Sequence, residues 1–217
     1  MIAVVDYHKG NLKSVERGLV GVGADARITD DVMQIRSAKA IVLPGVGAFT
    51  DAAESMRALD QMQVVMDCIR EGVPFLGICL GMHLLFESGC EHAIGQPTPG
   101  MGFLPGLVDR LPAQDAQGNM YKIPHVGWNT VDHAFEADAN PEAAALFEGL
   151  PSGEFFYFTH SFAVPESSAT IATTTHSVQF PCAVQIGPKA FGVQFHPEKS
   201  SDAGAKLLAN FVSLAQS

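Results

Sequence analysis

The sequence predicts an α/β fold: an open, mostly parallel, twisted sheet with helices on both faces and an additional antiparallel strand region in the second half. Three observations predict it. In the first half of the chain, short apolar runs alternate with longer segments of helical periodicity, as in strand–helix–strand units. Two of the short runs, 40–43 and 74–78, are continuously apolar, as central strands covered on both faces are. From about residue 102 onward, strand-like segments predominate.

The individual elements follow from periodicity and turn residues. Strands in the first half are expected at 2–6, 40–43 and 74–78, and helices at 11–22, 50–71 and 80–88. In the second half, strands are expected at 103–111, 154–163, 169–175, 182–186 and 190–195. The last two flank a hairpin-like break at Gly187-Pro188-Lys189. A closing helix starts near Ser200, because Leu207, Leu208 and Phe211 share one face after it.

Length, charge and cysteine usage narrow the class of protein. The 217 residues contain no internal repeat and no Gly/Ser linker, so we expect one domain spanning 1–217. A net charge of −10 disfavours nucleic acid and anionic membranes as partners, and the uncharged run 73–86 is shorter than the roughly 20 residues that cross a bilayer. The four cysteines lack metal-site or disulfide spacing, and no export signal is recognisable. We therefore expect a cytoplasmic protein without a metal or other cofactor.

The segment Gly77-Ile78-Cys79-Leu80-Gly81 has the Gly-x-nucleophile-x-Gly pattern in thiol form. Glycines permit a tight strand-to-helix turn, which presents the cysteine at the carboxyl edge of the sheet, where α/β proteins bind ligands. A helix N-terminus also favours the thiolate, the reactive form of cysteine. Cys79 is therefore the predicted nucleophile. The other cysteines lie outside such a turn and are expected to be structural: Cys68, Cys90 and Cys182.

A base for Cys79 is predicted at His196, which ends a predicted strand and precedes Pro197 and Glu198. Residues two apart in an extended chain face the same side, so Glu198 can orient the imidazole while the other ring nitrogen contacts the thiol. An isolated histidine is more often a satisfied surface or core residue. The strand-to-helix turn at Cys79, which we call the elbow, and the Glu198 carboxylate on the same face favour the catalytic interpretation of His196.

A third segment, Pro44-Gly45-Val46-Gly47-Ala48-Phe49, follows a central strand. Glycines on both sides of Val46 allow its N–H to point inward, where it complements the N–H of Leu80 in an oxyanion hole. The alternative is a simple turn rich in glycine and proline. We expect both donors at the carboxyl ends of parallel strands.

These three motifs together resemble the class I, triad-type glutamine amidotransferases, whose fold is flavodoxin-like. Further segments resemble the glutaminase subunits of imidazole glycerol phosphate synthase: Ile123-Pro124-His125-Val126-Gly127-Trp128-Asn129, Tyr157-Phe158-Thr159-His160-Ser161-Phe162, the run 193–200, and Asp6-Tyr7 with Gly10-Asn11. The resemblance spans residues 2 to about 212, and the Pro-His-x-Gly-Trp-Asn segment is specific to that subgroup.

The resemblance implies a glutaminase that hydrolyses L-glutamine through Cys79, His196 and Glu198. It implies that the ammonia passes to a separate cyclase subunit, a (β/α)8 barrel, which makes imidazole glycerol phosphate and AICAR in histidine biosynthesis as part of a heterodimer. It implies substrate contacts from Gly45, Gly47, His83, Ser161 and Phe162. It also implies a partner interface that includes Asn11, Lys13, Arg17, Trp128, Tyr157 and Lys199.

Three positions depart from the family pattern. His83 stands where the family usually has Gln, so it either contacts the substrate differently or packs on its helix. His8-Lys9 replaces Gly and a small or apolar residue, and Lys9 either pairs with a partner's acid or is solvated. Phe162 stands where Tyr is common. Trp128 is either a core residue or, in a loop between Gly127 and Asn129, an interface residue.

Three other functions are alternatives. The first is a glutaminase that serves a different acceptor enzyme, which the Pro-His-x-Gly-Trp-Asn segment disfavours. The second is a cysteine peptidase or chaperone-like member of the same fold, which the His-x-Glu arrangement disfavours. The third is a pseudoenzyme that only regulates a partner, which the intact Cys79, His196 and Glu198 disfavour.

Overall fold

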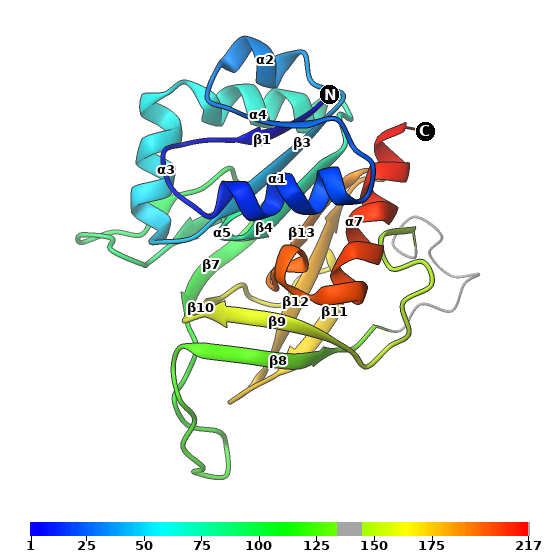
Figure 1. Ribbon diagram of the computed structural model, residues 1–217. Helices are drawn as coiled ribbons and strands as arrows, with labels where there is room; N and C mark the ends of the chain where they lie inside the picture. The colour runs from blue at the N-terminus through cyan, green and yellow to red at the C-terminus, as the bar shows by residue number, and fades with distance from the viewer. Residues whose placement is uncertain (134–144, 217) are drawn as a thin grey trace.

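A computed structural model of the protein describes residues 1–133 and 145–216. Its main layer is a seven-stranded sheet in the order β11-β12-β13-β4-β3-β1-β2 (Figure 1). The neighbouring strands β13, β4, β3, β1 and β2 are parallel, whereas β12 and β11 extend the sheet through antiparallel pairing. The predicted fold class, a mostly parallel sheet with an antiparallel region from the second half, is confirmed.

The main sheet contains β1 (Ile2–Val5), β2 (Ala26–Thr29), β3 (Ala40–Gly45), β4 (Phe75–Cys79), β11 (Thr170–Thr175), β12 (Gln179–Ile186) and β13 (Ala190–Val193). A four-stranded sheet contains β5 (Phe86–Gly89), β6 (Thr98–Pro99), β7 (Leu104–Arg110) and β10 (Phe162–Ala163). An antiparallel pair is formed by β8 (His125–Val131) and β9 (Glu154–His160). The helices are α1 (Leu12–Gly21), α2 (Val32–Arg36), α3 (Phe49–Ala58), α4 (Gln61–Arg70), α5 (Leu80–His83), α7 (Ser201–Gln216) and the 3₁₀ turn η1 (Pro197–Lys199).

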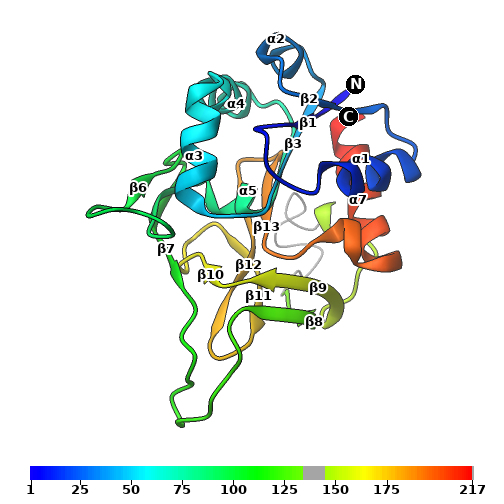
Figure 2. The ribbon, with the colours of Figure 1, turned by 60° about the vertical axis from the view of Figure 1, so that its left-hand side comes forward.

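Helices cover both faces of the main sheet because successive side chains of a strand point to opposite sides. In β1, Ile2 and Val4 belong to the core shared with α1 and α7, whereas Ala3 and Val5 belong to the core shared with α2, α3 and α4. Figure 2 shows α3 and α4 on one side of β1 and β3, and α1 and α7 on the other. In the described residues, no helix has the length and apolar character that a bilayer crossing needs.

Two helix predictions were wrong in extent. The segment predicted as one helix over 50–71 forms α3 and α4, separated at Leu59 and Asp60, where Asp60 is left-handed with φ 57°. The helix predicted at 80–88 ends at His83, and Phe86 begins β5. Phe86 is buried and pairs with Leu104 of β7, so strand pairing determines a short apolar run whose periodicity alone is ambiguous.

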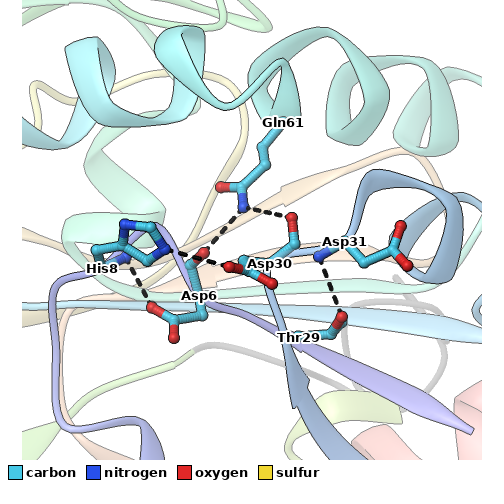
Figure 3. A network of polar contacts seen from close by, with 6 residues as sticks. All are labelled: Asp6, His8, Thr29, Asp30, Asp31 and Gln61. Carbon is cyan, nitrogen blue, oxygen red and sulfur yellow. Dashed lines mark hydrogen bonds and ion pairs between the residues drawn. The ribbon is translucent and has the colours of Figure 1, made fainter.

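The break between α3 and α4 places Gln61 at the carboxyl ends of β1 and β2. Its buried amide Nε2 donates to the carbonyls of Asp6 at 2.8 Å and Asp30 at 3.1 Å (Figure 3). The same network includes His8, whose N–H donates to Asp6 Oδ1 and whose Nε2 lies 3.2 Å from Asp30 Oδ2. Asp31 N–H donates to Thr29 Oγ1 beside it. These bonds fix the loop after β1.

Candidate active site

Cys79 ends β4, and α5 begins at the next residue. Its backbone has φ 53° and ψ −105°, a conformation that residues with side chains rarely adopt. The flanking glycines are required sterically, because a side chain at Gly77 would press on the Gly81 carbonyl and one at Gly81 would overlap the Leu43 carbonyl oxygen. The neighbouring strand β3 places Gly45 opposite Cys79. The predicted elbow thus lies at the carboxyl edge of the sheet.

His196 and Glu198 follow β13, which pairs with β4 on the side opposite β3. His196 Nδ1 lies 2.9 Å from Glu198 Oε1, and both side chains are 2% exposed. The contact is made across the 3₁₀ turn η1, not along the extended segment that the sequence predicted. The main chain of His196 is held at both ends: its N–H donates to the Tyr157 carbonyl at 2.9 Å, and its carbonyl accepts from Ser200 Oγ at 2.7 Å.

The electrostatics of His196 depend on two neighbours. Burial alone lowers the pKa of a histidine, but hydrogen bonding and charge interactions with Cys79 and Glu198 outweigh it and raise the pKa of His196 to about 9. Within the described residues, His196 Nε2 makes no hydrogen bond of standard length and angle, so its contact with the thiol is looser than the one to Glu198. The raised pKa favours the imidazolium form of His196 at neutral pH.

A pocket of about 410 Å³ opens over Cys79. It is lined by seven of the residues singled out in the sequence: Val46, Gly47, Cys79, Leu80, His83, Ser161 and Phe162. Six further residues complete the lining: Ala48, Glu91, His92, Pro124, Thr159 and His160. Gly45 is not part of the lining, because it lies within the sheet, where Tyr7 and Leu80 leave no room for a side chain. Gly47 has φ 105°, which only glycine adopts readily.

His83 is 4% exposed and contacts Gln194, the residue that follows β13. Its Nε2 lies 2.7 Å from Gln194 Oε1, and Gln194 Nε2 donates to Cys79 Sγ at 3.5 Å. Burial lowers the pKa of His83 to about 4, so the ring is neutral at pH 7. The polar edge of His83 is thus directed at Gln194.

Two more buried histidines hold the pocket wall at Phe162. His160 Nδ1 lies 2.8 Å from the Phe162 carbonyl and therefore carries the proton. The other nitrogen of His160 then accepts from His125 Nδ1, 3.1 Å away. Burial is the main reason that the pKa values fall to about 3 for His160 and about 4 for His125, so both rings are neutral. This pair fixes the carbonyl direction of Phe162.

Trp128, Tyr157 and Lys199 lie together on the surface. Trp128 is opposite Tyr157 in the β8–β9 pair, and Lys199 Nζ lies 5.8 Å from the Tyr157 ring centre. Trp128 is 51% exposed, so it is not a core residue, and it belongs to strand β8 instead of the loop that the sequence predicted. Alternation along the two strands puts Val126 and Phe155 on the same face, at 56% and 52% exposure.

The remaining predicted interface residues are exposed: Asn11 precedes α1, and Lys13 and Arg17 lie on it. Lys13 Nζ pairs with Glu16 at 3.0 Å, and Arg17 Nε donates to the Lys13 carbonyl. Lys9 Nζ lies 3.8 Å from Asp51 Oδ2, so this lysine has an acidic neighbour within its own chain.

Sequence reasoning missed Gln194, Glu91 and the buried histidine pair. Gln194 is two residues before the predicted base, but only the fold brings it to Cys79. Glu91 lies beyond every motif, yet it lines the pocket; burial raises its pKa despite the hydrogen bond from the Phe49 N–H. In the residues that the structure describes, no cluster of three or more His, Cys, Asp or Glu side chains is arranged to hold a metal.

Comparison with known proteins agrees with this geometry. The model of the family "Glutamine amidotransferase class-I" matches residues 3–214. Proteins named imidazole glycerol phosphate synthase subunit HisH are similar over the whole length: the one from Shouchella clausii is 41% identical, with 100% of this chain and 99% of the relative covered. Those from Moorella thermoacetica and Microcystis aeruginosa are 42% and 43% identical, covering 99% and 100% of this chain and 95% and 96% of the relatives.

Two solved structures share the fold. One, described as a glutamine amidotransferase crystal structure, has a TM-score of 0.72 at 21% identity, with 100% of this chain and 99% of the other covered. The other, PurLQS from Thermotoga maritima, has a TM-score of 0.69 at 16% identity, covering 98% and 97%. At these identities the likeness concerns the fold alone.

Proposed function

The chain belongs to the class-I glutamine amidotransferase family, and from this premise we propose that it is the glutaminase subunit of an imidazole glycerol phosphate synthase. In this role it hydrolyses L-glutamine and passes the ammonia to a cyclase subunit in histidine biosynthesis. The observation that carries the proposal is the strained Cys79 elbow at the base of a pocket, next to the buried His196–Glu198 pair. Full-length similarity to HisH proteins supports the choice among glutaminases.

The proposed chemistry proceeds through a thioester. The Cys79 thiolate attacks the side-chain amide carbon of glutamine, and the negative charge that develops on the oxygen is received by the N–H groups of Val46 and Leu80. His196 donates its proton to the leaving nitrogen, so ammonia departs as the C–N bond breaks. His196 then accepts a proton from water, which attacks the thioester and releases glutamate and the thiol. Glu198 keeps the imidazole oriented throughout.

The pocket offers groups for both ends of the substrate. The α-ammonium group of glutamine needs an acceptor, and the Glu91 carboxylate lines the pocket. Main-chain groups around Ser161 and Phe162 are suited to the α-carboxylate end, and the His125–His160 pair fixes them. A histidine hydrogen-bonded to Gln194 replaces the family's usual Gln at position 83, so the substrate's amide has one polar contact fewer on that side.

The partner is proposed to bind the outer face of β8 and β9. Val126, Trp128 and Phe155 are exposed there and form an apolar stripe with the half-buried Tyr157, and exposed aromatic residues are frequent anchors of protein interfaces. The stripe is connected to the site by main-chain hydrogen bonds, because Tyr157 accepts from the His196 N–H and donates to Ser200 Oγ. Covering this face also shields ammonia from water. Ammonia that escaped would be protonated and lost as a nucleophile.

We further propose that the chain alone hydrolyses glutamine slowly and that the loaded partner activates it by reorienting the peptide units of Gly45-Val46-Gly47. The test is glutamate release by the chain alone, with the cyclase subunit, and with the cyclase subunit plus its nucleotide substrate. Strong stimulation by the loaded partner, absent in Cys79→Ala, is expected. Equal turnover with and without it contradicts the activation, and no complex with the cyclase favours a glutaminase for another acceptor.

The interface is tested with a matched pair of substitutions. Val126→Glu introduces a charge into the apolar stripe and is expected to weaken cyclase binding at least tenfold. Met33→Glu changes another exposed apolar residue, 71% exposed on α2, and is expected to leave binding unchanged. Binding is measured by titration calorimetry. Equal affinities for both variants would place the interface elsewhere.

A further inference from the structure

Three buried side chains, linked by hydrogen bonds, connect helix α5 to the nucleophile. His83 is 4% exposed, Gln194 is 0% exposed and Cys79 is 6% exposed. The His83 ring contacts the Gln194 carboxamide at 2.7 Å, and the carboxamide nitrogen contacts the Cys79 sulfur at 3.5 Å. Since the side chains are buried, solvent does not replace these contacts when one is lost.

The donor and acceptor roles in these two hydrogen bonds follow from the chemistry of the groups. A carboxamide oxygen only accepts, so the neutral His83 ring must place its single proton on Nε2 to bind Gln194 Oε1. With its oxygen held in this way, Gln194 has only N–H groups to present to the sulfur. If the carboxamide were rotated by half a turn, its oxygen lone pairs would face the sulfur and oppose a negative charge there.

We propose that His83 is a positioning residue for Cys79: its ring N–H holds the Gln194 carboxamide so that an amide N–H points at the sulfur and stabilises the thiolate. This inference rests on the proposed function, in which that thiolate attacks glutamine. It assigns His83 to the nucleophile instead of the substrate. Hydrogen bonds from N–H groups to charged acceptors are stronger than those to neutral ones, so the donor favours the thiolate over the thiol.

Other titratable groups near the sulfur are retained when His83 or Gln194 is replaced. They include His196, whose pKa the thiol helps to raise, the buried Tyr7 hydroxyl near Gly45, and Glu91, His92 and His160 of the pocket lining. An effect that replacing His83 and replacing Gln194 have in common, and that does not add up in the double variant, therefore separates Gln194 from these groups.

The experiment measures the rate at which iodoacetamide alkylates Cys79 in the full chain as a function of pH, with the modified peptide identified by mass spectrometry. His83→Phe keeps a planar ring but lacks the donor, and we expect the pH midpoint of alkylation to rise by about one unit, equivalent to tenfold less thiolate at a fixed lower pH. His83→Gln can place an amide N–H near the former Nε2 position, so it should restore the midpoint to within a few tenths of a unit. His133→Phe, outside the pocket lining, is the control and should leave the midpoint unchanged.

A double-substitution cycle decides whether His83 acts through Gln194. Gln194→Met, which is similar in volume but has no N–H, should raise the midpoint as much as His83→Phe does, and the two together should raise it no further. Gln194→Met also carries the test if His83→Phe does not fold. An unchanged midpoint in either variant, or additive shifts, overturns the proposal. Alkylation needs no glutamine turnover, so a chain without glutaminase activity would contradict the proposed function while leaving this result intact.

Discussion

The backbone of Cys79 makes a measurable prediction about stability. A non-glycine residue at φ 53° and ψ −105° lies in a sparsely populated region, which costs on the order of 1–3 kcal/mol. Cys79→Ala retains this strain, whereas Cys79→Gly relieves it. Glycine also loses more backbone freedom on folding than alanine, which costs roughly 0.5–1 kcal/mol. The difference leaves Cys79→Gly more stable than Cys79→Ala by about 1 kcal/mol.

Comparing these two variants isolates the backbone effect, because neither has the thiol. For a chain of this size, 1 kcal/mol shifts the melting temperature by roughly 2–4 °C. Thermal unfolding followed by circular dichroism, or urea unfolding at fixed pH, measures the difference. If Cys79→Ala were instead more stable by the 0.5–1 kcal/mol typical of a relaxed position, the elbow would store no strain and the reasoning would be refuted.

Three further predictions concern the pH dependence of stability, the η1 turn and the Glu198 carboxylate. Folding keeps His83 neutral, with a pKa of about 4 against the usual 6.5. Its contribution to stability is therefore present above pH 6.5 and is lost as the pH falls toward 4, by about 3 kcal/mol in total. Urea unfolding midpoints measured from pH 7 to pH 4 check this, and His83→Phe should make the decline in stability smaller. In Gly204→Ala, the new methyl group would overlap the Pro197 carbonyl and displace the turn that carries Glu198. Glutaminase activity in steady-state assays should therefore fall at least tenfold. Gly21→Ala is the control and should leave activity unchanged, because there is open space around Gly21. Glu198→Gln keeps the shape but removes the charge that helps to raise the pKa of His196, so kcat should fall by about 100-fold or more, and a kcat within a few-fold of wild type would contradict its role.

Local motifs made much of the site predictable. The glycines around Cys79 are contiguous with it, and His196 and Glu198 are two residues apart, so neither inference needed the fold. The contact between His196 and Glu198 was expected from an extended chain but occurs across a 3₁₀ turn. The two conformations differ, yet both bring positions two apart close enough for a hydrogen bond.

Contacts between distant parts of the chain were not predictable in this way. His83 and Gln194 are 111 residues apart, and only the adjacency of β4 and β13 brings α5 to the residue after β13. Likewise, Trp128 was expected in a loop because Gly127 and Asn129 flank it, whereas pairing with Tyr157 makes it part of a strand. Pairing with a distant strand overrides local preferences of this kind.

The central claim is that Cys79 is the nucleophile toward glutamine. Its most direct test is to incubate the chain, with its cyclase partner, with a glutamine analogue that carries an electrophilic carbon at the amide position, and to locate the covalent label by peptide mass spectrometry. The account predicts one label per chain, on the peptide that contains Cys79, with protection by excess glutamine. Labelling of another residue, or glutamate release that persists in Cys79→Ala, would contradict it.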